Sequence, residues 1–176
     1  MTRTELIQRY RIAENIDPEG DSCYSITPRL INGQALSVDQ SEMVNNLDSA
    51  FEDTTSQDET VLYRGTSNSC LQIIKDDSQG RYPSFVSTSL DIFEAQQFLI
   101  EDHPILLKII CPKGVPFMQI SSPEISGLEA SEILLPRNTR FKISDWNPLE
   151  GLSTVDKLRF GQRPESEYAT LRVITE

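Results

Sequence analysis

The sequence predicts one α+β domain with mainly antiparallel strands. Two observations support this fold class: helical patterns come first, and short segments rich in β-branched and aromatic residues follow them. We expect residues 1–58 to form a helical part and residues 59–176 a β-rich part of the same domain. The 176 residues are 38% hydrophobic, which suits one globular domain with a core of its own.

Two amphipathic helices are predicted over residues 4–16 and 37–51, because apolar side chains recur there at helical spacing among polar ones. Residues 17–34 and 52–60 contain turn formers and acidic side chains. We therefore expect both of these segments to be surface connections.

After residue 58 the pattern is that of strands with one helix among them. Residues 90–100 place Ile92, Ala95 and Leu99 on one apolar stripe, which predicts a short helix. Segments bounded by Gly, Pro, Asn or Asp and rich in β-branched residues are the predicted strands. They are residues 59–65, 83–89, 105–112, 132–136, 139–146 and 167–176.

The charge and the metal-binding residue types exclude several classes of function. With 27 Asp and Glu against 16 Lys and Arg, the net charge is −11, and this disfavours a nucleic-acid partner. Cys23, Cys70 and Cys111 lie far apart, and with His103 as the one histidine they show no metal-site spacing. No apolar run could span a membrane and no secretory signal is present, so we expect a cytoplasmic protein without a membrane partner.

Three motifs occur in an informative order. Residues Leu62-Tyr63-Arg64-Gly65 end one predicted strand, Ser87-Thr88-Ser89 end the next, and Glu132 precedes an Ile-Leu-Leu-Pro segment. In this order and spacing they resemble the motifs of mono-ADP-ribosyltransferases of the arginine–serine–glutamate class, which includes bacterial toxins, effectors and phage enzymes. The resemblance implies N-terminal helices beside two facing, mainly antiparallel sheets that form a cleft for NAD⁺.

The chemistry of NAD⁺ cleavage gives these residues distinct roles. A diphosphate needs a permanent cation that donates in two directions, and Arg64 meets that need. Glu132 would hold the ribose and stabilise the positive charge that develops as the bond to nicotinamide breaks. By resemblance, Ser87 orients Glu132, while Gly65 and Thr88 lie on the nicotinamide side of the cleft.

Ser89 and Phe98 complete the predicted cofactor-binding residues. Ser89 is expected to cap the following helix whatever its other role. Phe98 is expected in the core, as Phe85 is, although family members often have an aromatic residue near the nicotinamide. NAD⁺ is therefore the predicted substrate, and no metal is required.

The predicted acceptor site departs from the family pattern. Many family members have Glu or Gln two residues before the catalytic Glu, where it engages the acceptor, and this position is Ala130 here. An arginine acceptor needs a carboxylate there, so we expect a Ser or Thr hydroxyl instead. Glu129, Glu124 or the target itself would activate it, although on a regular strand Glu129 faces the side opposite to Glu132. By resemblance, residues 119–128 correspond to the target-recognition loop.

Two alternatives to protein modification remain open. Ala130 is compatible with an NAD⁺ glycohydrolase, which releases free ADP-ribose. The other alternative is a catalytically inactive module that binds a basic protein partner with its acidic surface. The resemblance implies a monomer that acts on a target protein, either in its own cytoplasm or after delivery into a host cell without a classical signal peptide.

Overall fold

The computed structural model describes residues 5–6, 9–10, 20–100, 103–119, 132–148 and 167–175, with only the main chain at residues 147–148. Its helices are α2 (Cys23–Ile31), α3 (Val38–Ala50), α4 (Asn68–Asp76) and α5 (Ile92–Gln96). Its strands are β1 (Thr60–Ser67), β2 (Val86–Ser89), β3 (Pro104–Cys111), β4 (Met118–Gln119), β5 (Glu132–Leu135), β6 (Phe141–Pro148) and β7 (Glu167–Val173). An α+β fold is therefore confirmed.

The N-terminal helices agree with the sequence pattern only in part. Helix α3 begins with a capping box in which Ser37 and Gln40 each accept a hydrogen bond from the other's main-chain N–H, and this confirms the helix predicted over residues 37–51. Within the predicted helix 4–16, the described residues are helical. The surface connection predicted over residues 17–34 is wrong where α2 forms, because burial of Ile26 offsets the unfavourable Pro28 inside that helix.

All seven strands belong to one sheet in the order β4-β5-β2-β1-β3-β7-β6. Neighbouring strands are antiparallel except for the parallel pair β3–β7, so the prediction of mainly antiparallel pairing is confirmed. Strands β1 and β2 meet at a single pair, Tyr63 opposite Ser89, within the described residues. The described strands thus form one sheet, and the two facing sheets implied by the resemblance stay a prediction.

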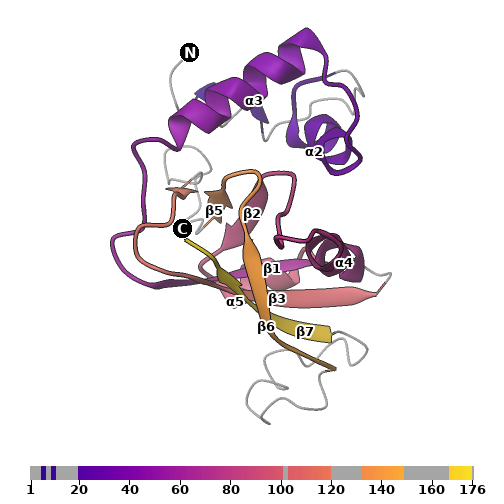
Figure 1. Cartoon of the computed structure of the whole chain (residues 1–176), viewed down its shortest axis with the longest axis vertical. Helices are drawn as coiled ribbons and strands as arrows, with labels where there is room; N and C mark the ends of the chain where they lie inside the picture. The colour runs from indigo at the N-terminus through magenta and orange to yellow at the C-terminus, as the bar shows by residue number, and fades with distance from the viewer. Residues whose placement is uncertain are drawn as a thin grey trace.

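Figure 1 shows α2 and α3 on one side of β2 and β5, and β1, β3 and β7 on the other side. Two apolar clusters lie between these layers. The larger cluster lies between β1, β3 and β7 on one side and Val86, Ile133 and Leu135 of β2 and β5 on the other. The second cluster joins the N-terminal helices to the opposite face of β2 and β5, where it includes Phe85 and Leu134. Strands β2 and β5 are therefore covered on both faces, and this fixes the motif residues that they carry.

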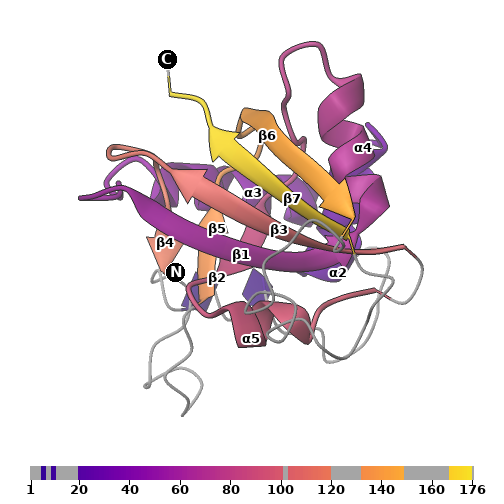
Figure 2. The ribbon, with the colours of Figure 1, turned by 90° about the horizontal axis from the view of Figure 1, so that it is seen from below.

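Helix α5 packs on the face of β1 and β3 that the larger cluster leaves open. Ala95 and Leu106 are buried there, with Ile92 and Leu99 packed against them. Figure 2 shows α5 beside β1, next to the end of β2. The apolar stripe predicted for this helix is confirmed, although the helix itself ends at Gln96.

Candidate active site

The serine run and Glu132 lie on directly paired strands. In the register between β2 and β5, Ser89 is opposite Glu132 and Ser87 is opposite Leu134. Because side chains alternate along a strand and opposed residues share a face, Ser87, Ser89 and Glu132 lie on one side of this pair. Glu132 is half-buried, so its carboxylate is neither sealed in the core nor fully in water.

Arg64 reaches this strand pair from β1. One terminal nitrogen of its guanidinium donates to the main-chain carbonyl of Ser87 at 2.7 Å. This contact joins the two strands close to their single residue pair. The structure therefore brings Arg64 to the predicted serine, through the main-chain carbonyl of that serine.

The guanidinium of Arg64 retains donor capacity for an anion. Among the described residues, its Nε is buried without a hydrogen-bond partner, and none of the ion pairs between described residues involves Arg64. A cation in this state suits the diphosphate of a dinucleotide, which would supply both the charge and the acceptor oxygens. Arg64 therefore fits the diphosphate of NAD⁺.

Three groups around Arg64 are kept neutral by burial. Burial raises the pKa of the phenols of Tyr10 and Tyr82 and of the thiol of Cys70, while the positive charge of Arg64 acts in the opposite direction on each. The surroundings therefore do not neutralise the arginine charge. No local pattern in the sequence connects these groups with Arg64, and Tyr10 lies 54 positions before it along the chain (64 − 10).

Ser89 connects the strand pair to α5. Its Oγ donates to Glu94 Oε2 at 2.8 Å and accepts from the main-chain N–H of Asp91 at 2.9 Å. Asp91 is the N-cap of α5 and accepts from the N–H of Phe93. The Ser-Thr-Ser run thus supports the helix start, as expected, although Asp91 rather than Ser89 occupies the cap position.

Gly65 has a packing role that the sequence did not predict. A Cβ on this residue would lie 2.0 Å from the main-chain oxygen of Ala95 and 3.0 Å from the nitrogen of Leu99. Only glycine lets α5 approach β1 this closely. The predicted contact of Gly65 with NAD⁺ stays a prediction.

The positions of Thr88 and Phe98 in the structure do not support their predicted roles in cofactor binding. Thr88 lies on the face opposite to Glu132, where its buried hydroxyl donates to the carbonyl of Ile133 at 2.7 Å. Phe98 is 70% exposed, so the core position expected for it is wrong, because it follows the end of α5 and lies beyond the buried stripe. The core position expected for Phe85 is confirmed by its 3% exposure.

The predicted acceptor residues Glu124, Glu129 and Ala130 lie outside the described residues, as does most of the loop 119–128. Glu94, by contrast, contacts the serine run through Ser89, and sequence reasoning missed this contact. Its position on the helix after the serine run was a weak signal, because an acidic residue in a first helical turn is common for reasons of helix stability alone.

The part of the chain that the structure describes has neither a metal-binding cluster nor a membrane-spanning helix. It contains no group of three or more His, Cys, Asp or Glu side chains that could hold a metal ion. It also has no helix that is both long and apolar enough to cross a membrane.

The fold, with Arg64, Ser87 and Glu132 on adjoining strands, is typical of an ADP-ribosyltransferase, and comparison with known proteins agrees. The model of the ADP-ribosyltransferase exoenzyme family matches residues 26–161, and the chain belongs to this family. The members of this family are NAD-dependent ADP-ribosyltransferases, so the resemblance found in the sequence is confirmed. No curated protein matches the chain.

Solved structures show the same fold. Plx2a, an ADP-ribosyltransferase toxin from Paenibacillus larvae, has a TM-score of 0.66 at 19% identity, over 99% of this chain and 88% of that one. C3stau2 from S. aureus, solved with NAD, has a TM-score of 0.62 at 20% identity, over 100% and 89% of the chains. Exoenzyme S from Pseudomonas aeruginosa, solved with human 14-3-3 protein beta and Carba-NAD, has a TM-score of 0.60 at 17% identity, over 84% and 64%.

Proposed function

We propose that this protein transfers one ADP-ribose from NAD⁺ to a protein side chain and releases nicotinamide. The observation that carries the proposal is the arrangement of β1, β2 and β5, in which Arg64 binds β2 at Ser87 while Ser89 lies opposite Glu132. Membership of the exoenzyme family supports the same chemistry. Each motif residue then has a task that its position allows.

Arg64 binds the diphosphate of NAD⁺ with the donors that the protein leaves unused. Glu132 accepts hydrogen bonds from the ribose hydroxyls and stabilises the positive charge that develops on the sugar. The bond from ribose C1′ to the nicotinamide nitrogen breaks, and its electron pair leaves with nicotinamide. A bond from C1′ to the acceptor oxygen forms, and the hydroxyl proton is released.

The acceptor is a serine or threonine hydroxyl of a target protein. This choice rests on Ala130, which leaves no carboxylate at the position where many family members engage the acceptor. The same residue favours a second candidate function, NAD⁺ glycohydrolysis, in which water takes the place of the acceptor hydroxyl. The target is a host protein reached after delivery into the host cytoplasm, and the toxin among the structural neighbours supports this setting.

The proposal is tested by incubating the protein with NAD⁺ and a eukaryotic cell lysate and identifying products by mass spectrometry. Glu132→Gln should lower transfer by about 10²- to 10³-fold, because it removes a charge that stabilises the transition state. Arg64→Lys should weaken NAD⁺ binding, because an ammonium cannot donate in two fixed directions.

The exposed Glu42 on α3 offers a matched control, and Glu42→Gln should retain full activity. Far-UV circular dichroism must show all three variants folded. Free ADP-ribose without labelled protein would replace the proposal with glycohydrolysis. Neither product would favour the inactive binding module.

A further inference from the structure

A second carboxylate lies beside the strand pair that carries Glu132. Glu94 on α5 accepts a hydrogen bond from Ser89 at 2.8 Å, and Ser89 is the residue directly opposite Glu132. Opposed side chains on one face of an antiparallel pair are close neighbours, with Cβ atoms about 5 Å apart. A single serine therefore links the position of Glu94 to that of Glu132.

The place of Glu94 at the end of the strand pair is also informative. Glu132 is the first residue of β5, and it pairs with the last residue of β2, from which the chain turns into α5. Glu94 thus lies at the end where the chain enters β5. Ala130, which stands where many family members have Glu or Gln, precedes β5 by two residues in the sequence.

The orientation of Glu94 is set on two sides. One carboxylate oxygen is fixed by the hydroxyl of Ser89, and the helix that carries Glu94 is capped by Asp91 and packed on β1 through Ala95 over Gly65. A carboxylate has about four lone-pair sites, and the hydrogen bond from Ser89 uses one of them. Glu94 is half-buried, so its side chain is also reachable from outside.

We propose that Glu94 is the carboxylate that binds and orients the acceptor side chain, the task that Ala130 cannot perform. This rests on the proposed transfer function. The hydroxyl of the acceptor donates its hydrogen to Glu94, which takes the proton as the oxygen forms its bond to ribose C1′. The electron pair of the broken C1′–nitrogen bond leaves on nicotinamide, so charge and atoms balance.

The surface next to Glu94 suits a protein acceptor. Leu90 and Phe93, which lie on either side of the helix start, are 46% and 58% exposed. Exposed large apolar side chains offer contact area to a protein partner. A target segment that lies across them would bring its hydroxyl to Glu94.

The test compares transfer with hydrolysis in the same reaction. Wild type and Glu94→Gln are incubated with biotinylated NAD⁺ and a eukaryotic cell lysate, and labelled protein and free ADP-ribose are both quantified. The ratio of transfer to hydrolysis should fall about tenfold or more in Glu94→Gln, since general-base assistance contributes roughly 10²-fold or more. A structural defect would lower both products together and leave the ratio unchanged.

Further variants separate the possible outcomes. Glu42→Gln controls for loss of one carboxylate on a helix and should keep the wild-type ratio. Glu94→Asp should recover part of the ratio, because it restores the carboxylate at a shorter reach. An unchanged ratio in Glu94→Gln overturns the role of Glu94 and leaves transfer intact. Wild type that yields free ADP-ribose and no labelled protein overturns both proposals. Glu132→Gln tests the proposed function separately, because it should lower both products whatever the role of Glu94.

Discussion

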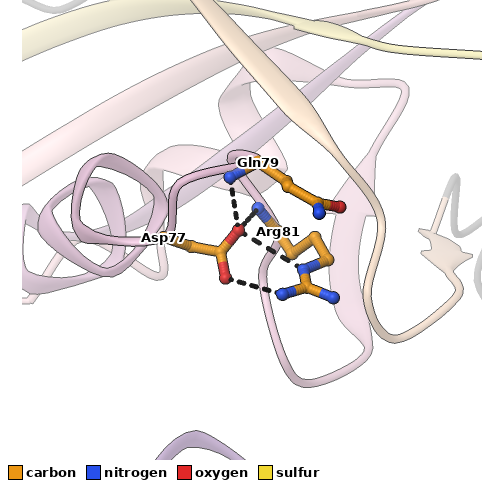
Figure 3. A network of polar contacts seen from close by, with 3 residues as sticks. All are labelled: Asp77, Gln79 and Arg81. Carbon is orange, nitrogen blue, oxygen red and sulfur yellow. Dashed lines mark hydrogen bonds and ion pairs between the residues drawn. The ribbon is translucent and has the colours of Figure 1, made fainter.

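Asp77 shows at the residue scale how one carboxylate determines the path of the chain (Figure 3). Its Oδ1 accepts from the main-chain N–H groups of Gln79 and Arg81 at 2.9 and 3.0 Å, and the guanidinium of Arg81 contacts both oxygens at 3.3 Å. This turn leads from α4 to Tyr82, one of the residues around Arg64. An exposed turn thereby contributes to the position of a site neighbour.

The same contacts predict a pH dependence of stability. The hydrogen bonds from Arg81 and Gln79 lower the pKa of Asp77 to about 2. The carboxylate form is therefore favoured in the folded state, so its stabilising contribution is present above its ordinary pKa of 3.8 and is lost as the pH falls through about 2. Asp77→Asn should lower the melting temperature at neutral pH, and this difference should shrink as the pH approaches 2.

Thermal unfolding monitored by circular dichroism across this range measures the effect. Asp76→Asn is the matched control, because Asp76 is the adjacent residue and accepts a side-chain hydrogen bond from Gln72 alone among the described contacts. A melting-temperature difference for Asp77→Asn that is the same at every pH would contradict the prediction.

Helix α5 is the element whose placement most affects the proposed site. Gly65→Ala would put a methyl group 2.0 Å from the main-chain oxygen of Ala95, so α5 must move away from β1. We expect a loss of about 1–3 kcal/mol in the free energy of unfolding, which is typical of overpacking. The displacement should also reduce the ratio of transfer to hydrolysis, because Glu94 moves with the helix.

Urea unfolding and the product ratio together check this prediction. Gly33→Ala is the control, since Gly33 has φ +62° and open space around its Cβ position. That variant should lose about 1 kcal/mol from backbone strain and keep the wild-type product ratio. A Gly65→Ala protein with full stability would mean that α5 does not pack as described.

Elements differ in how well the sequence predicted them. The predicted strand segments correspond to β1, β2, β3, β5, β6 and β7, and the apolar spacing over residues 37–51 predicts α3. Helix α4 was not predicted, and α2 was assigned to a connection. Both are nine residues long, so their local pattern is short, and burial of Ile26 in one and of Leu71 and Ile74 in the other stabilises them.

The apolar cluster beneath the N-terminal helices bears on the whole molecule. Phe85, just before β2, stacks on Phe51 of the helical part with 6.0 Å between the ring centroids. It also packs against Tyr10 in a T-shaped arrangement with 5.7 Å between the ring centroids. Met118 and Leu134 of the β-rich part share this cluster. We therefore expect the helical and β-rich parts to unfold together as one domain.

Urea unfolding tests this expectation with two probes. Fluorescence of Trp146, the one tryptophan, reports on β6, and far-UV circular dichroism reports on the helices. The two transitions should coincide, and Phe85→Ala should shift both by about 3–5 kcal/mol. Tyr24→Ala, at a side chain that is 63% exposed, should change the stability by less than about 0.5 kcal/mol. Separate transitions for the two probes would indicate two independent units.

The sequence by itself determined the residue types of the site, their order, and the strands that carry them. Local periodicity and short motifs are sufficient for this, because Arg64 lies within a recognisable strand, the serine run ends the next one, and Glu132 begins another. The sequence also indicated from Ala130 that acceptor binding differs from the family pattern.

Only the tertiary structure decided which residues surround the motif. Packing brings groups together or fixes their orientation. Examples are the parallel pairing of β3 with β7, the approach of α5 over Gly65, and the contact between Ser89 and Glu94. Tyr10, Cys70 and Tyr82 come within reach of the charge of Arg64 for the same reason. Such contacts form because distant apolar surfaces are buried together, and no local pattern specifies which surfaces will meet.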